Sequence, residues 1–168
     1  RVNDPSSKQR IIVKSPTGSG KTVILISFIE DYLLYKDPNK IFIWLTPGKG
    51  DLEEQSKEKM EAILPNAKTA NISDALLQGF KPGYTYFINW EMITNKKNNA
   101  LKDSEKKNLY ERIAEAHREQ YSFITIIDEE HLNNTAKADD VLNAFDSEKE
   151  IRVSATTKKN PMAEYLSL

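Results

Sequence analysis

The sequence contains no cysteine and only two histidines, His117 and His131. Without thiols the chain has neither a disulfide framework nor a thiolate metal site, and two histidines alone do not make a zinc site. Its 24 Lys and Arg residues are balanced by 25 Asp and Glu residues, which gives a formal net charge of −1. A chain without an excess of positive charge has no global field that attracts nucleic acid, so any such binding must depend on a local patch.

The sequence also lacks a secretory signal and any apolar run long enough to cross a bilayer. We therefore expect a cytoplasmic protein that does not associate with a membrane. A length of 168 residues fits one domain with a substantial core. We predict a single domain over residues 1–168, and the short flanks of its first and last motifs indicate a fragment of a longer multidomain chain.

Apolar runs alternate with helical segments along the chain. We predict strands over 9–14, 41–45, 68–72, 84–90, 123–127 and 151–153. We predict helices over 20–35, 51–64, 73–78, 109–121 and 136–145, with an exposed loop over 96–107. This alternation predicts an α/β fold with a mostly parallel central sheet and helices on both faces, in three layers. Helix 20–35 is apolar on most sides, so we expect it to be largely buried.

A glycine-rich segment connects the first strand to the first helix. It reads Ser-Pro-Thr-Gly-Ser-Gly-Lys-Thr, with Ser15 where the usual phosphate-binding loop has glycine. Backbone N–H groups of such a turn and the positive end of the following helix dipole bind phosphate groups. The predicted nucleotide-binding residues are Pro16, Thr17, Gly18, Ser19, Gly20, Lys21 and Thr22. Lys21 would reach the β- and γ-phosphates and Thr22 would ligate Mg²⁺; the alternative is a glycine turn that only starts a helix.

An acidic segment, Asp128-Glu129-Glu130-His131, follows the apolar strand at 123–127. In phosphate-loop enzymes a carboxylate in the position of Asp128 holds Mg²⁺, and Glu129 could accept a proton from the attacking water. The alternative is that both acids only cap the next helix. His131 is predicted to form hydrogen bonds either to the nucleotide site or to Thr156, and so to have a coupling role. We further expect the glycine-rich loop and this acidic segment to come from neighbouring strands.

The order of these motifs resembles the first RecA-like domain of a superfamily two helicase or translocase. It comprises the glycine-rich loop, then Thr46-Pro47 with Leu52 and Gln55, then the acidic segment of the DEAH-box kind, then Ser-Ala-Thr at 154–156. Within that superfamily the chain is most similar to the ATP-dependent subunit of type III restriction enzymes. The segments that carry this closer likeness are 87–91, the Asn- and Lys-rich stretch after Thr94, and 135–139.

The resemblance implies a RecA-like P-loop ATPase that uses ATP and Mg²⁺, with Lys21, Asp128 and Glu129 as its catalytic residues. It implies that Ser154, Ala155 and Thr156, with His131, couple hydrolysis to movement on nucleic acid. It also implies DNA contacts by Thr46, Pro47, Gly48, Lys49 and Asn89.

The partners it implies are duplex DNA, a second RecA-like domain that supplies an arginine finger, and a modification (methyltransferase) subunit, in a parent that could be an endonuclease. Two alternatives stay open at this point. One is the first domain of another superfamily two DNA or RNA helicase, and the other is a nucleotide-binding regulatory module without motor output.

Overall fold

The computed structural model describes residues 9–14, 20–46, 52–89, 103–128, 136–154 and 163–167. The strands are β1 Gln9–Lys14, β2 Ile41–Thr46, β3 Thr69–Asn71, β4 Thr85–Asn89, β5 Phe123–Asp128, β6 Lys149–Ser154 and β7 Ala163–Ser167. The helices are α1 Gly20–Tyr35, α2 Leu52–Ile63, α3 Ile72–Gln78, α5 Asp103–Arg118 and α6 Ala136–Phe145. Within these ranges no helix is both long and apolar enough to cross a bilayer.

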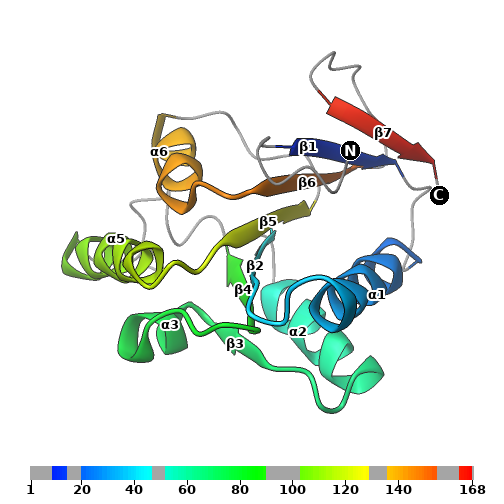
Figure 1. Ribbon diagram of the computed structural model, residues 1–168, viewed down its shortest axis with the longest axis horizontal. Coiled ribbons are helices and arrows are strands. Elements are labelled where there is room, and N and C mark those ends of the chain that lie inside the picture. The colour runs from blue at the N-terminus through cyan, green and yellow to red at the C-terminus, as the bar shows by residue number, and fades with distance from the viewer. Residues whose placement is uncertain are drawn as a thin grey trace.

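The strands form one seven-stranded sheet in the order β3-β4-β2-β5-β6-β1-β7, and every pairing is parallel. Parallel neighbours require crossover connections, and helices α1, α2, α3, α5 and α6 supply them between successive strands from β1 to β6. Figure 1 shows α1 and α2 on one side of the sheet and α3, α5 and α6 on the other. The predicted three-layer α/β fold is therefore confirmed.

Each face of the sheet has its own hydrophobic core, because alternate side chains of a strand point to opposite faces. On one face, Phe42 and Trp44 of β2 pack with the buried side chains of α1 and with Met60 of α2. On the other face, Ile43 and Leu45 pack with residues of α3, α5 and α6. All six residues of β2 are buried, which confirms the inference from its unbroken apolar run that both faces are covered.

Helix α1 is less buried than its composition predicted. Its inward stripe consists of Leu25, Ile26, Ile29 and Tyr32, whereas Val23, Ile24, Leu34 and Tyr35 are exposed. A straight helix can turn only one side toward a sheet, so apolar residues on its other side remain uncovered unless another element packs there. The expectation of a largely buried helix was therefore wrong for its outer side.

Two other segments differ from the prediction. The predicted loop over 96–107 contains the first residues of α5, which begins at Asp103 rather than at Leu109. This first turn and a half is polar and has no apolar spacing to reveal a helix, although acidic residues favour a helix N-terminus. Strand β7, which pairs with β1 at the sheet edge, was not predicted.

A cluster of polar side chains forms hydrogen bonds between the amino ends of β2, β5 and β6. The buried ammonium of Lys40, just before β2, donates hydrogen bonds to Ser122 Oγ before β5 and to Glu148 Oε2 before β6. Lys149 Nζ lies 3.7 Å from Glu148 Oε1. Tyr32 of α1 covers the cluster, with Lys40 Nζ 5.8 Å and Lys149 Nζ 5.7 Å from its ring centroid.

These contacts shift the titration of the cluster. Burial, with the charges of Glu148 and Asp37 adding to it, raises the pKa of Tyr32 to about 12, so its hydroxyl stays neutral. Burial alone would raise the pKa of Glu148, but the hydrogen bond and charge of Lys40 outweigh it and hold that pKa below its usual value. Burial lowers the pKa of Lys149 against the opposing effect of Glu148.

Candidate functional site

The carboxyl ends of the strands gather the described members of the predicted site along one edge of the sheet. Because all pairings are parallel, the last residues of the strands lie at the same edge. Four of these last residues belong to the predicted site: Thr46 in β2, Asn89 in β4, Asp128 in β5 and Ser154 in β6. Strand β1 ends at Lys14, directly before the glycine-rich loop.

The strand register places these ends in a row. Asp128 pairs with Val153, Val153 pairs with Val13, and Ser154 pairs with Lys14. Strand β6 therefore lies between β1 and β5, so the expectation that the two nucleotide motifs follow neighbouring strands was wrong. Two strand spacings separate the ends of β1 and β5, which corresponds to about 10 Å.

Helix α1 begins at Gly20, so Lys21 and Thr22 occupy its first turn. The first turn of a helix has N–H groups without intrahelical partners, and the helix dipole is positive there. No acidic side chain occupies this turn to compete with a bound anion. The Thr22 side chain is half-buried. This end of α1 therefore has the physical properties of an anion-binding position.

The oxygen donors at this edge match the preference of Mg²⁺. Thr22 offers a hydroxyl and Asp128 a carboxylate, and Mg²⁺ takes few protein oxygens while it keeps several of its waters. Groups of three or more His, Cys, Asp or Glu residues that could form a denser metal site are absent from the part of the chain that the structure describes.

Thr46 and Asn89 pair with each other across β2 and β4. The Thr46 side chain is fully buried, and its hydroxyl donates a 3.5 Å hydrogen bond to the carbonyl oxygen of Ile88. A contact of Thr46 with DNA in this arrangement would thus involve its backbone rather than its hydroxyl. Asn89 is half-buried at the end of its strand.

Several predicted site residues lie outside the described ranges. They are Pro16, Thr17, Gly18, Ser19, Pro47, Gly48, Lys49, Glu129, His131, Ala155 and Thr156. Each of them directly follows or lies within a few residues of a strand end named above, and their roles remain predictions. Lys14 is a position at the same edge that sequence reasoning did not single out; its place directly before the glycine-rich loop was the available signal.

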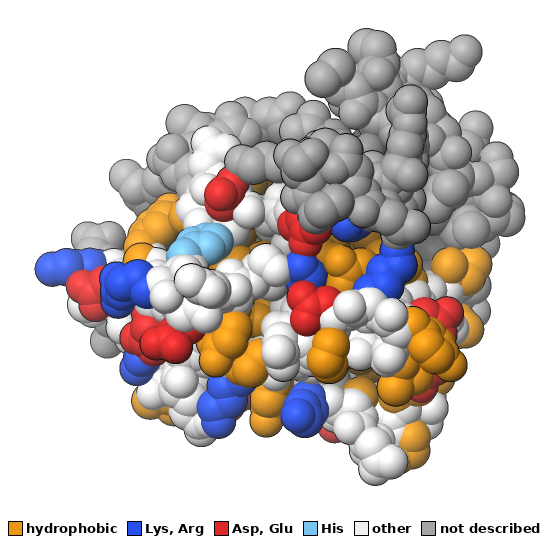
Figure 2. All heavy atoms as spheres, in the orientation of Figure 1, with side chains coloured by type: hydrophobic (Ala, Val, Ile, Leu, Met, Phe, Trp, Pro, Cys, Tyr) orange, Lys and Arg blue, Asp and Glu red, His pale blue; other side chains and the backbone are white. Residues whose placement is uncertain are grey.

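The charge on the visible surface is mixed. On the face drawn in Figure 2, the acidic and basic side chains of the described residues are interspersed rather than separated by sign. This agrees with the near-zero net charge of the chain. Binding of a nucleic acid backbone therefore needs a local group of donors, as the composition already implied.

The parallel sheet with helices on both faces is consistent with the RecA-like α/β class. Residues 3–159 match the family model described as Type III restriction enzyme, res subunit. This match covers most of the chain, so the chain belongs to that family, which is a family of N-terminal domains of superfamily two helicases. A comparison with curated proteins finds no match. Membership makes the chain a helicase-like ATP-binding domain, and the family in general uses ATP and Mg²⁺.

Proposed function

We propose that this chain is the first motor domain of a DNA translocase in a type III restriction enzyme, and that it is one domain of a longer protein. In this proposal it binds Mg-ATP at the carboxyl edge of the sheet and couples ATP hydrolysis to movement along duplex DNA. The observation that carries the proposal is that β1, β5 and β6, the strands that directly precede or carry the predicted nucleotide motifs, pair in parallel and end at the same edge of the sheet.

Each residue would have a distinct part in this chemistry. The loop from Pro16 to Ser19 and the first N–H groups of α1 would bind the phosphates, and Lys21 would neutralise charge on the β- and γ-phosphates. Thr22 and Asp128 would hold Mg²⁺, which when bound offsets the charge that develops on the transferred phosphoryl group. Glu129 would orient the attacking water and accept its proton.

The position of β6 supports the coupling role of the Ser-Ala-Thr segment. Ser154 is the last residue of β6. This strand lies between β1, which precedes the glycine-rich loop, and β5, which leads into the acidic segment. Residues that follow this strand, Ala155 and Thr156, would therefore respond to changes on either side of the bound nucleotide. His131 would complete the link from the acidic side. On the DNA side, Pro47 to Lys49 and Asn89 would contact backbone phosphates, which position DNA without reading its sequence.

Calorimetric titration of the 168-residue chain with Mg-ATP tests the nucleotide site. Lys21→Ala should abolish measurable binding, whereas Lys107→Ala, which removes an exposed lysine of α5, should leave the affinity unchanged. Unchanged affinity in the Lys21 variant would refute the phosphate role. In the full-length parent, Glu129→Gln should retain binding and stop hydrolysis, and normal turnover would remove Glu129 as the residue that activates water.

The nucleic acid is tested by stimulation of ATP hydrolysis in the parent. Duplex DNA should stimulate turnover more than RNA does. Stronger stimulation by RNA would favour an RNA helicase, and turnover that no nucleic acid changes would favour a regulatory module. The isolated domain should hydrolyse ATP slowly, because a missing arginine finger reduces the rate by roughly 10³ to 10⁵ where it has been tested.

A further inference from the structure

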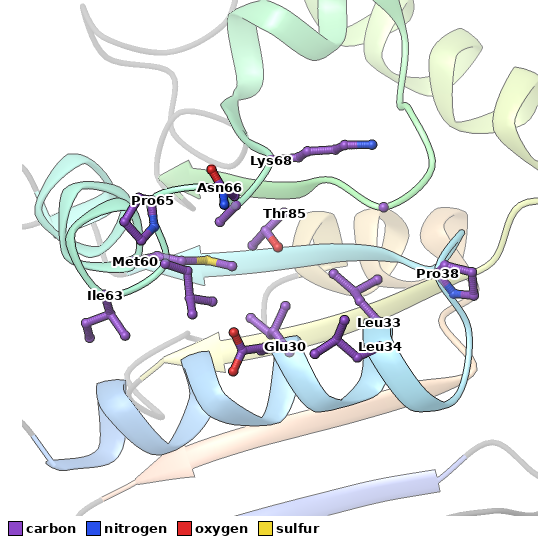
Figure 3. A pocket seen from close by; sticks show the side chains of 14 residues that line it. Glu30, Leu33, Leu34, Pro38, Met60, Ile63, Pro65, Asn66, Lys68 and Thr85 are labelled. Carbon is purple, nitrogen blue, oxygen red and sulfur yellow. The ribbon is translucent and has the colours of Figure 1, made fainter.

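A pocket lies between α1 and α2, away from the edge that carries the nucleotide motifs. Its volume is about 540 Å³. This falls within the range of roughly 300–1,000 Å³ that is typical of small-molecule sites. The lining comes from α1, α2, the turns that follow them, and the start of β4. Figure 3 shows side chains of α1 and of α2 facing each other across the cavity.

The pocket is distinct from the nucleotide site. Pro38, Lys68 and Gly83 line it, and they precede β2, β3 and β4. It therefore opens at the amino ends of these strands, whereas the nucleotide motifs follow carboxyl ends. Along α1, eleven residues separate Thr22 from Leu33, which corresponds to about 16 Å of helix.

The lining is mostly apolar. It includes Leu33 and Leu34 from α1, and Met60, Ile63 and Leu64 from α2 and its end. Leu34 is 66% exposed and Ile63 is 40% exposed. Binding of an apolar body that removes these side chains from water is favourable by about 25 cal/mol for each Å² of apolar surface covered.

Two polar groups in the lining indicate what else a ligand should carry. Thr85 forms part of the lining, and its hydroxyl is buried without a hydrogen-bond partner among the described residues. Glu30 of α1 has no ion-pair partner within the described ranges, and Figure 3 shows it beside the apolar side chains of the cavity. Lys68, the lining residue of opposite charge, lies with its Nζ 5.9 Å from the ring centroid of Tyr84. The charge that a ligand in this pocket would meet is therefore the negative charge of the Glu30 carboxylate.

We propose that this α1–α2 pocket binds a small amphipathic molecule with an apolar body and a cationic nitrogen group. The apolar body fills the space between Leu33 and Ile63, and the cation lies against the Glu30 carboxylate. A hydroxyl or amide on the body can pair with Thr85 after a small local adjustment. The proposal does not depend on the motor function, because none of these residues belongs to the nucleotide site.

Three probes with the same body and different head groups test the proposal: 4-phenylbutylamine, 4-phenylbutan-1-ol and 4-phenylbutanoate. Each is titrated into the 168-residue chain and followed by protein NMR shifts. The amine should bind more tightly than the alcohol by about fivefold, the upper end for a partly exposed ion pair, and the carboxylate should bind most weakly. Intermolecular contacts should appear at Leu33 and Ile63. Saturating Mg-ATP should not displace the amine.

Protein variants test separately how the head group and the apolar body of the ligand contribute to affinity. Glu30→Gln should reduce the affinity of the amine to that of the alcohol and leave the alcohol unchanged. Ala67→Phe fills the pocket and should abolish binding of the amine and the alcohol, whereas Ala62→Phe, at an exposed position of α2 outside the lining, should have no effect.

Three outcomes would overturn the proposal. One is a carboxylate that binds as tightly as the amine, and another is an amine whose affinity Glu30→Gln does not change. The third is a set of contacts in the wild-type chain at residues other than the lining. This last measurement does not depend on whether the Ala67 variant folds.

Discussion

Removal of the Glu148 carboxylate should weaken the fold more than removal of any exposed carboxylate. Glu148→Gln leaves the buried ammonium groups of Lys40 and Lys149 without their main counter-charge. Among the described residues, the remaining ion pair of the cluster is the one between Lys40 Nζ and Asp37, at 3.6 Å. Loss of one partner of a buried ion pair costs about 3–5 kcal/mol. The Glu148 side chain is 21% exposed, and together with the remaining Asp37 this reduces our expectation to about 2 kcal/mol.

Urea denaturation at pH 7, followed by tryptophan fluorescence, measures this cost. Trp44 is fully buried, so its emission reports the loss of the core. The matched control is Glu61→Gln, which breaks an exposed pair with Lys57 on α2 and should cost less than about 0.5 kcal/mol. Equal costs in the two variants would refute the reasoning.

The pH dependence of the same comparison has a definite sign. The pKa of Glu148 is lowered in the folded state from its ordinary value of 4.5. Its stabilising effect is therefore complete above pH 4.5 and is lost as the pH falls through the folded-state pKa. The difference in unfolding free energy between wild type and Glu148→Gln should be largest at neutral pH and should shrink below pH 4.5. A difference that grows on acidification would contradict this assignment.

Further predictions concern substitutions at four positions. Gly83→Ala should cost about 2–3 kcal/mol in urea denaturation, because Gly83 has φ +80° and an added Cβ would lie 2.9 Å from the Pro38 carbonyl oxygen. Gly79→Ala, with φ +81° but with only side-chain atoms of Glu115 and Arg112 near the added Cβ, should cost about 1 kcal/mol, and the reverse order would refute the steric argument. Asn71 is the N-cap of α3, and its side-chain oxygen accepts a 3.0 Å hydrogen bond from the Asp74 N–H. Asn71→Ala should therefore cost about 1 kcal/mol in the same assay, and an unchanged stability would show that the cap is unimportant. Thr22→Val should reduce the dependence of ATP affinity on Mg²⁺ in calorimetry while Asp128 keeps part of it, and an unchanged dependence would exclude the hydroxyl as a ligand.

The sequence predicted the layers of the fold because burial leaves a strong local pattern. The unbroken apolar run of β2 and the largely apolar β5, with Thr125 as its one polar residue before Asp128, can be stable only when both faces are covered, so helices on both sides followed directly. The helix at 136–145 was predicted with its observed bounds. In contrast, the polar start of α5 and the short strand β7 carry no such pattern, and their positions depend on contacts with distant parts of the chain.

The order of the strands could not be predicted in the same way. A parallel crossover allows the next strand to be placed beside its predecessor or further along the sheet, and local residue patterns do not distinguish these options. The sequence therefore predicted that Asp128 and the loop before α1 lie at one edge, but not that β6 lies between them. The buried Lys40 cluster was also not predicted, because its members are 82 and 108 residues apart in sequence from Lys40.

Because β6 lies between β1 and β5, it determines which changes in the sequence can alter the separation of the glycine-rich loop and the acidic segment. Their separation is fixed by two ladders of backbone hydrogen bonds, on either side of β6, and not by the identity of any one side chain. Core substitutions that preserve these ladders can accumulate without altering that separation. A one-residue insertion within β6, however, would shift the register against both neighbours at once and displace the loop and the acidic segment relative to each other.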